Sequence, residues 1–436
     1  MAMQLYLKKG SATTDFQSGT DKCTLVDGFN PAVGQVGEEV TEEFEIWMYH
    51  DTNTSRVDFI REVNALFQDA RHWEIGREPV WLYFAIDEVT TAYRAQVLDG
   101  LITFTPKLGT HWKNARTKAV VRIQREAAWE ADTWTAIGIS NGNGSGVTTG
   151  LHVYNCNDGT GTSPNKKNNY ATITGTDILG DLPGPAKLQI TPADSLNRII
   201  VGNYVDVDAV GNYPVDLVDF SGTADSNSSG GQYLRKTIAA GFESAWSTSL
   251  AHAYFQSNWI RIYARFSNAV PDGFRLKVGF QVGSILMGET NENWLTTDRL
   301  QCLGMVKFPP YKKFSSPPTN FILYHTLYSR DGGNLDMDCY YLIGANYFAD
   351  LGRDDAYTIG SGSRFVEEWG SERRSYAETT GGADQQRFFN FDYGEGIYLE
   401  PGKNQKLQFM SMNGIQASID DDFTVKLWHK PRRLSL

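Results

Sequence analysis

The sequence predicts a mainly β protein made of several domains, and three observations support this. Glycine occurs 42 times and aromatic residues make up 13% of the chain, a composition that favours strands and turns. An apolar fraction of 41% is enough to fill packed cores, which argues against a disordered chain. At 436 residues the chain is too long for one ordinary core, so we expect two or three domains.

One segment near the N-terminus, residues 54–73, has the spacing of an amphipathic helix. The apolar residues that recur there at helical steps are Phe59, Val63, Leu66 and Ala70. Ser55 followed by Asp58 predicts a capping box at the start of the helix.

Strands are predicted on both sides of this helix. Four short segments rich in β-branched or aromatic residues are separated by turn residues: 42–50, 80–86, 93–106 and 117–130. One strand before the helix and three after it predict an α+β sandwich or split barrel over residues 1–140.

A stretch rich in glycine, asparagine and aspartate, residues 141–162, comes next. It lacks the lysine and hydroxyl residue that follow the glycines of a phosphate-binding loop, and a strand-like segment stands where a dinucleotide-binding loop needs a helix. It also lacks the spacing and final glutamate of an EF-hand loop. We therefore interpret it as a turn-rich seam between domains, and residues 220–232 as a second composition break of the same kind.

The segments between and after these breaks read as short strands. In residues 259–266 and 274–282, every second residue is apolar, as expected for half-buried antiparallel strands. In residues 334–343 we expect one face to hold Leu335, Met337, Cys339, Tyr341 and Ile343, with Asp336 and Asp338 on the other. Short strands with long loops and no helix predict a jelly-roll β-sandwich.

Charge and hydropathy restrict the partners. A formal net charge of −11 gives no cationic face for a phosphate backbone, so we expect no nucleic-acid recognition. The longest apolar run, residues 80–86, is far shorter than a bilayer span, and the N-terminus does not read as a secretion signal. We expect no membrane insertion, and a protein that either stays in the cytoplasm or leaves the cell as part of an assembly.

The usual catalytic motifs are missing from the sequence. The seven histidines occur singly, and neither a zinc-protease helix motif nor a serine nucleophile elbow is present. Neighbouring acids such as Glu367 and Glu368 would point to opposite faces of a strand, unlike the facing pair of a glycosidase. We expect no enzyme and no cofactor.

Tryptophans in polar surroundings are candidates for binding sugars. Trp246, Trp294 and Trp369 each lie in a polar segment, and exposed indole rings can stack on the apolar faces of sugars. Trp246 and Trp294 are the two that we select as carbohydrate-binding residues. Packing in a core or an interface is the alternative for each ring.

Several segments resemble, in their order along the chain and in their residues, the distal tail (Dit) family of long-tailed phages. On the N-terminal side the segments are LVDGFNP, EIWMYH, VNALFQDAR, PVWLYF, YRAQVLDGLITF and AVVRIQREAAWE. On the C-terminal side they are YLEPGKNQKLQF and FTVKLWHKPRRLSL. The first set is similar to the family's first domain, which builds a ring around the tail channel. The second set is similar to the closing strands of its galectin-like domain.

This resemblance implies a domain order. A ring-forming domain would span residues 1–140, and a galectin-like β-sandwich would combine residues 141–219 with 350–436. The segments SNSSGGQYLRKTI and LDMDCYYLIG are similar to the first and last strands of carbohydrate-binding jelly rolls, so residues 220–349 would be an inserted module of that kind. In such modules an acid near the last strand often helps to hold a structural calcium ion, a placement that Asp338 matches, together with Asp219.

The resemblance also implies partners and a location. We expect a homo-oligomeric ring, a hexamer, at the tail tip of a virion, made in the host cytoplasm and contacting the tail tube, the baseplate hub and a host-surface polysaccharide. Two alternatives from other classes are a free carbohydrate-binding protein or adhesin, and a β-sandwich enzyme that degrades glycans. The missing secretion signal argues against the first, and the missing acid pair argues against the second.

Overall fold

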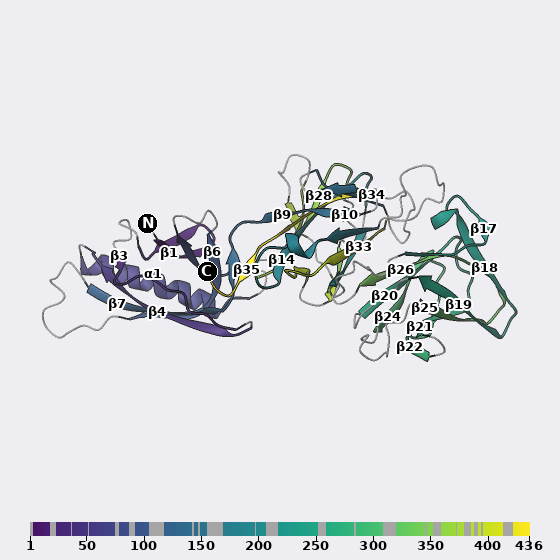
Figure 1. Ribbon diagram of the computed structural model, residues 1–436, viewed down its shortest axis with the longest axis horizontal. Helices are drawn as coiled ribbons and strands as arrows, with labels where there is room; N and C mark the ends of the chain where they lie inside the picture. The colour runs from purple at the N-terminus through teal and green to yellow at the C-terminus, as the bar shows by residue number, and fades with distance from the viewer. Residues whose placement is uncertain are drawn as a thin grey trace.

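The structure is a computed structural model, and it describes residues 3–17, 23–35, 37–50, 52–74, 78–86, 92–103, 117–141, 144–146, 149–154, 169–196, 198–205, 217–251, 259–282, 285–307, 320–344, 347–351, 359–371, 373–378, 385–387, 391–393, 396–412 and 422–436. The chain is mainly β, with a single α-helix and two short 3-10 turns (Gly175–Asp177 and Ser229–Gly231) in this described part. Its strands form three groups in a row, and the helix belongs to the group at one end (Figure 1). Of the predicted seam at 141–162, residues 144–146 and 151–154 are strands that pair within the sheets and are not a linker, and residues 155–162 lie outside the described residues.

The first group, which we call the first unit, is one nine-stranded sheet that bends around a core and is joined by a helix. Its strand order is β2-β1-β5-β6-β7-β4-β3, with β8 and β35 attached beside β6. The strands are β1 (Met3–Lys9), β2 (Ala12–Asp15), β3 (Cys23–Leu25), β4 (Glu39–Met48), β5 (Trp81–Ile86), β6 (Tyr93–Thr103), β7 (Thr117–Glu126), β8 (Trp129–Ala131) and β35 (Arg432–Arg433). The four predicted strands are present, and β1 to β3 were not anticipated.

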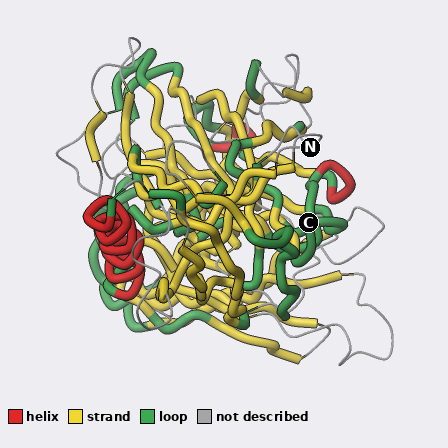
Figure 2. Tube along the Cα trace, turned by 90° about the vertical axis from the view of Figure 1, so that its left-hand side faces the viewer, coloured by secondary structure: helices red, strands yellow, loops and turns green. Residues whose placement is uncertain are grey.

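Helix α1 (Asn53–Arg71) packs along β6. The four residues of its predicted apolar face are all buried in the core of the first unit. Its cap differs from the prediction: Thr52, not Ser55, is the N-cap, and the Thr52 hydroxyl accepts a hydrogen bond from the backbone N–H of Ser55 at 3.1 Å. Seen along the long axis from the first unit, α1 lies at the side of the strands (Figure 2).

The middle unit is a sandwich of two sheets. Each sheet combines strands from residues 135–205 with strands from residues 347–429. In the seven-stranded sheet β13 and β15 both pair with β33, and in the eight-stranded sheet β14 pairs with β28 and β34. The first sheet holds β10 (Ile139–Asn141), β11 (Gly144–Gly146), β13 (Tyr170–Ile173), β15 (Arg198–Val205), β27 (Tyr347–Leu351), β31 (Phe391–Tyr393) and β33 (Gln405–Met412). The second holds β9 (Thr135–Ile137), β12 (Leu151–Tyr154), β14 (Gly184–Pro192), β28 (Arg364–Glu368), β29 (Arg374–Glu378), β30 (Gln385–Arg387), β32 (Tyr398–Leu399) and β34 (Asp422–His429).

The third group, which we call the insert, is a second sandwich, of a six-stranded and a five-stranded sheet. The first has the order β17-β18-β26-β20-β24 with β16 beside β26, and the second has β19-β25-β21-β22 with β23 beside β21. The six strands are β16 (Leu217–Asp219), β17 (Thr223–Ala224), β18 (Gln232–Ile238), β20 (Trp259–Phe266), β24 (Leu300–Lys307) and β26 (Gly333–Gly344). The five are β19 (Phe242–Ala251), β21 (Phe274–Val282), β22 (Ile285–Glu289), β23 (Asn293–Trp294) and β25 (Asn320–Ser329).

The sheets divide the chain a few residues away from the expected boundaries. Strand β16 belongs to the insert, because Leu217 to Asp219 pair with β26, so the insert begins before residue 220. Strand β9 already pairs with β34 of the middle unit before residue 141. At the other end of the chain, β35 leaves the middle unit and pairs with β8 of the first.

The insert and the middle unit share an apolar interface. Ile200, Phe348 and Met410 of the seven-stranded sheet pack in one buried cluster with Tyr263, Leu300, Cys339, Tyr341 and Ile343 of the insert. Close approach here requires glycine: a Cβ on Gly202 would lie 2.3 Å from the carbonyl oxygen of Gly344. The insert is therefore packed against the middle unit and is more than a module on a flexible tether.

Strand β26 does not keep the single apolar face that its sequence predicts. Leu335 and Met337 face the core of the insert, whereas Cys339, Tyr341 and Ile343 face the middle unit. The pairing with β20 shifts between Arg265 and Phe266, which pair with Cys339 and Met337 and leave Asp338 as the extra residue. An extra residue of this kind is a β-bulge, and it exchanges the two faces of the strand beyond it.

Candidate functional site

Asp338, one of the two residues predicted to bind calcium, lies at this bulge and is fully buried. Its Oδ2 accepts a hydrogen bond from Nη1 of Arg265, with which it forms an ion pair. Its Oδ1 accepts a hydrogen bond from the backbone N–H of Ser229 at 2.7 Å. Arg265 also donates to the carbonyl oxygen of Asn227, at 3.2 Å from Nη1 and 3.1 Å from Nη2.

Asp219, the second predicted ligand, lies beside the same turn. Its Oδ1 accepts a hydrogen bond from the Ser229 hydroxyl at 2.5 Å. Gly230 comes next, with a φ of 71°, a backbone conformation that favours glycine. A Cβ added to Gly230 would face the Asp219 carboxyl. The serine- and glycine-rich break of the sequence is therefore an ordered turn held by carboxylates and one guanidinium group.

This donor set does not fit a calcium ion. Calcium takes six or more oxygen ligands, but both Asp338 oxygens already accept N–H donors and a guanidinium cation lies against one of them. Among the described residues no three histidine, cysteine, aspartate or glutamate side chains gather closely enough to hold a metal ion. The sequence analysis did not single out Arg265, the partner of Asp338. A buried acid in an apolar strand needs a cationic partner, and Arg265 lies in another predicted strand of the same sandwich.

Trp246 was predicted to bind a sugar, but its ring faces the core of the insert. It is partly buried and packs against the insert core. Its ring stacks on His325, with centroids 4.5 Å apart and planes 7° apart, and the Lys236 ammonium lies 4.7 Å from its centroid. Burial lowers the pKa of His325 to about 3, so the imidazole is neutral at physiological pH. Trp369 is also buried, in the core of the middle unit.

Trp294 is exposed, with 53% of its surface accessible. It pairs with Arg275 across β23 and β21, and Arg275 pairs with Tyr328 across β21 and β25. The Arg275 guanidinium carbon lies 4.7 Å from the Trp294 ring centroid and 4.3 Å from that of Tyr328. Glu292 approaches the Arg275 Nε at 3.4 Å. Of the predicted sugar-binding residues, Trp294 has the exposure that stacking requires.

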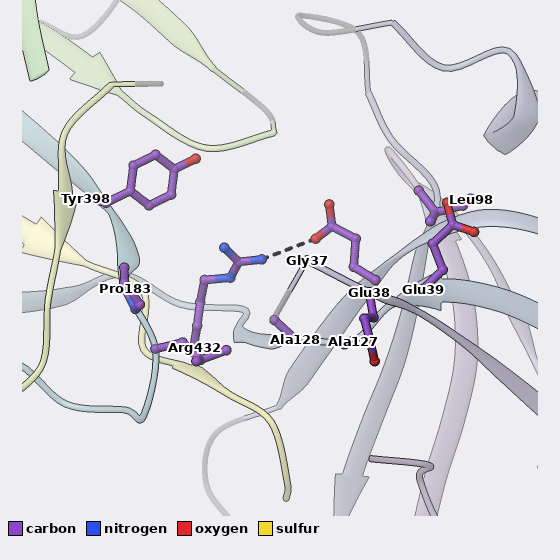
Figure 3. Close-up of a pocket in the computed structure, with 11 residues that line it drawn as sticks. Gly37, Glu38, Glu39, Leu98, Ala127, Ala128, Pro183, Tyr398 and Arg432 are labelled. Atoms are coloured by element: carbon purple, nitrogen blue, oxygen red, sulfur yellow. Dashed lines mark hydrogen bonds and ion pairs between the residues drawn. The ribbon is translucent and has the colours of Figure 1, made fainter. Parts of the chain in front are cut away.

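A pocket of about 470 Å³ lies where the first unit meets the middle unit. The first unit contributes residues from before β4 and from β6 and β7, and the middle unit contributes Leu182, Pro183 and Tyr398. Figure 3 shows Arg432 reaching across this pocket, where it forms an ion pair with Glu126 at 3.2 Å. Partial burial raises the pKa of Glu126; Arg432 opposes this shift, and the charge of Glu130 adds to it.

The C-terminal residues hold these two units together. The carbonyl oxygen of Arg432 accepts hydrogen bonds from the N–H groups of Asp181 and Leu182, while that of Pro431 accepts one from Ala131. Lys430 lies 3.5 Å from Glu130, which also pairs with Arg94 at 3.0 Å. A short C-terminal strap, residues 430–433, is thus bonded on one side to the first unit and on the other to the middle unit.

None of the described helices combines the length and apolar character that a membrane span needs. No protein-family model and no curated protein matches the chain.

Three solved structures with some likeness to the chain come from a phage baseplate, a phage tail protein and a carbohydrate-binding module. The baseplate of phage P2 in its activated conformation with Ca is 8% identical, covers 99% of this chain and 98% of its own, and has a TM-score of 0.27. The Dit protein of SPP1, from the adsorption apparatus of phages that infect Gram-positive bacteria, is 9% identical over 99% of both chains, with a TM-score of 0.25. A family 35 carbohydrate-binding module from an environmental isolate is 14% identical over 32% of this chain and 93% of its own, with a TM-score of 0.19.

Proposed function

We propose that this chain is a structural component of a phage tail tip, in which copies of the first unit close into a ring that joins the tail tube to the baseplate hub. The N-terminal segments that carry the sequence resemblance form the framework of the first unit: VNALFQDAR forms the C-terminal half of α1, and AVVRIQREAAWE runs through β7 and β8. The C-terminal segments supply β33, the central strand of the seven-stranded sheet, and β34, an inner strand of the eight-stranded sheet.

The observation that carries this proposal is the order of the three units. The first unit and the insert lie at opposite ends of the molecule, with the middle unit between them (Figure 1). The strap fixes one junction, and the buried apolar cluster around Ile200 and Tyr341 fixes the other. A ring built from the first unit would therefore carry the insert at a defined distance from the channel.

We further propose that the pairing of β13, β14 and β15 with strands beyond residue 346 marks a discontinuous second domain. The expected division at 141–219 and 350–436 needs moving by a few residues, to the boundaries that the sheets follow. Each domain then has a core of its own, which is the property that defines a domain.

The first unit offers a surface through which copies could contact one another. Leu101 on β6 is 49% exposed, and it pairs with Arg122, which in turn pairs with Glu43. The neighbouring row places Thr103, Val120 and Glu45 side by side on the same face. Among the described residues of the first unit, Leu101 and Val33 are the large apolar side chains that are exposed, and Leu101 lies on the outer face of the sheet. We propose that this face makes the repeated contact of a hexameric ring, since cyclic symmetry closes such head-to-tail contacts.

In this proposal the insert contacts a host-surface polysaccharide through Trp294, and the chain has no catalytic role. Each contact would be weak, and several copies on one ring would bind together with much greater strength. Calcium has no part in the proposal, because the Asp338 site is occupied by its own ion pair.

Mass photometry and electron microscopy of the full chain test the ring. We expect particles of six times the 48.7 kDa chain mass, with a central channel, and immunogold labelling at the tail tip of virions. A protein that stays monomeric at high concentration and is absent from particles would contradict the ring. If such a monomer bound glycans, the free carbohydrate-binding protein would become the better reading.

A further inference from the structure

The outer face of the five-stranded sheet of the insert presents an ordered row of side chains. Glu243 pairs with Tyr328, Tyr328 with Arg275, and Arg275 with Trp294, so these four residues of β19, β25, β21 and β23 lie side by side. Directly opposed residues in an antiparallel sheet share one face. On the other face of the same strands, Leu276 and Leu327 are fully buried in the core. The row therefore faces away from the core.

The Trp294 ring is held in a fixed position. Arg275 lies over both Trp294 and Tyr328, and these two rings meet edge to face with centroids 6.3 Å apart. Cation–π and edge-to-face contacts of this kind restrain an exposed ring without covering it. An indole restrained in this way loses little conformational entropy when a ligand stacks on it.

The charges on this face are already balanced within the protein. Arg275 is paired with Glu292 at 3.4 Å, and Lys277 with Glu289 at 2.5 Å. Glu243 adds a third carboxylate at the end of the row. An anionic ligand would meet more carboxylates than cations here, so the electrostatics disfavour it.

Near the row, the rest of the face carries hydroxyl groups and small side chains, and farther along β22 and β25 it carries the apolar side chains of Leu286, 41% exposed, and Ile322. Thr326 and Tyr324 alternate with core residues on β25, and exposed Ala245, Ser247 and Ser249 alternate along β19. A protein interface would be expected to have a larger contiguous apolar centre with few charges. One exposed indole among hydroxyl groups and paired charges instead matches a sugar, which has apolar C–H faces and a rim of hydroxyls.

We propose that this row binds an uncharged polysaccharide, with Trp294 stacking on the C–H face of a pyranose ring and Arg275 and Tyr328 fixing the indole. This inference rests on the proposed function, in which the insert contacts a host glycan, and it adds the binding face and the chemical class of the ligand. Glu243, Thr326 and Ser247 lie on the same face, in this row and in the two rows that follow it. Their side chains can form hydrogen bonds with sugar hydroxyls.

The test uses the full-length protein in affinity electrophoresis against a panel of soluble polysaccharides, some neutral (dextran, galactomannan, rhamnan) and some anionic (polygalacturonate, hyaluronate). We expect retention by at least one neutral polymer, and at least about a tenfold loss of affinity for Trp294→Ala, as for an aromatic residue at the centre of a binding surface. Phe242→Ala is the matched control. Phe242 is 65% exposed on the same sheet, but it pairs with Ser329 and through it with the buried Phe274, so it lies on the opposite face and its loss should leave retention unchanged.

Glu292→Gln tests the chemical class separately. Removing this carboxylate leaves Arg275 without its partner, so retention by polygalacturonate should increase while retention by the neutral polymer stays within about twofold. Wild-type protein that prefers the anionic polymers, or a Trp294→Ala variant that binds as well as wild type, would overturn the inference and leave the proposed function standing. A wild-type protein retained by no polymer would overturn both the inference and the glycan contact, while ring formation by the same sample would show whether the structural role survives.

Discussion

Arg265 and Asp338 form an ion pair inside the insert, with the Arg265 side chain 6% exposed and the Asp338 side chain completely buried. The pair lies where β26 shifts its register against β20, and it reaches the turn before β18 through Ser229 and Asn227. One buried carboxylate thus links the bulge that exchanges the faces of β26 to the turn that precedes β18.

The first prediction is that Asp338→Asn strongly destabilises the insert. Asparagine has nearly the same volume but leaves the buried Arg265 without a counter-ion, and breaking one partner of a buried pair typically costs about 3–5 kcal/mol. Hydrogen exchange of peptides covering residues 225–238 should accelerate, and the first thermal transition should move to lower temperature.

Asp331→Asn is the control for this change. Asp331 also pairs with an arginine of the insert, Arg330, but that pair is exposed on both sides, and exposed pairs contribute little. If both variants unfold like wild type, the Arg265 pair does not hold the turn as described.

The second prediction concerns metal removal. Because Asp338 and Asp219 accept N–H and O–H donors of the protein itself, adding calcium or a chelator should leave the melting temperature of the insert unchanged. Differential scanning fluorimetry in calcium and in EDTA measures this. A clear rise in melting temperature with calcium would show that the turn rearranges to bind the ion.

The third prediction is a pH dependence that originates from His325. Burial lowers the pKa of His325 from 6.5 to about 3, so between these values the unfolded chain holds a proton that the folded chain does not. Stability is therefore complete above pH 6.5 and is lost as the pH falls toward 3, by about 1.4 kcal/mol per unit. Hydrogen exchange of β25 peptides between pH 7 and pH 4, corrected for the intrinsic rate, should show this loss.

His325→Phe isolates that contribution. The ring keeps an aromatic partner for Trp246, Phe220 and Tyr340 but binds no proton. The variant should be less sensitive to pH than wild type over this range. Equal slopes in both proteins would place the pH dependence elsewhere, for instance at His429, whose pKa is also lowered by burial.

Periodic apolar segments were the part of the fold that the sequence could predict. The helix follows from the spacing of Phe59, Val63, Leu66 and Ala70, and its cap was misplaced because Thr52 and Ser55 can both supply a capping hydroxyl. Strand β1 was missed although Leu5 and Leu7 are buried at alternate positions, since it ends in two lysines, and β2 and β3, the short strands at the two edges of the sheet, were missed as well. Local periodicity is visible in a single sequence, but short edge elements depend on the sheet that they join.

The candidate site was harder to predict, because it depends on register. Trp246 and Trp294 both have polar neighbours, yet Trp246 pairs with His325 on the inner face while Trp294 pairs with Arg275 on the outer one. The inner neighbours of Trp246 on β19, Ser244 and Thr248, are small and polar, which hides the direction of that face. The bulge at Asp338 likewise has no local signal, since it is defined by the pairing with β20.

The fourth prediction is that the C-terminal strap fixes the first unit against the middle unit. Deleting residues 431–436 removes the pairing of β35 with β8 and the Arg432 bonds to Glu126, Asp181 and Leu182. Each unit should stay folded, because its core lies elsewhere, but the connection at residues 132–134 should become sensitive to protease. Arg432→Ala, which keeps the backbone pairing, should show a smaller effect. If the deletion leaves both protease sensitivity and small-angle scattering unchanged, other contacts hold the junction.

The fifth prediction is that Leu101→Asp prevents ring formation while the chain stays folded. Leu101 is half exposed on the outer face of β6, so aspartate there removes no core contact, but it would place an unpaired charge in the centre of the proposed contact between copies. Mass photometry should then show monomers where wild type shows the ring, with an unchanged melting temperature. Leu179→Asp is the matched control, since Leu179 is 51% exposed but lies in the middle unit, between β13 and β14. Rings that form normally with Leu101→Asp would exclude this face of the first unit as the contact, and rings lost only with Leu179→Asp would move the contact to the middle unit.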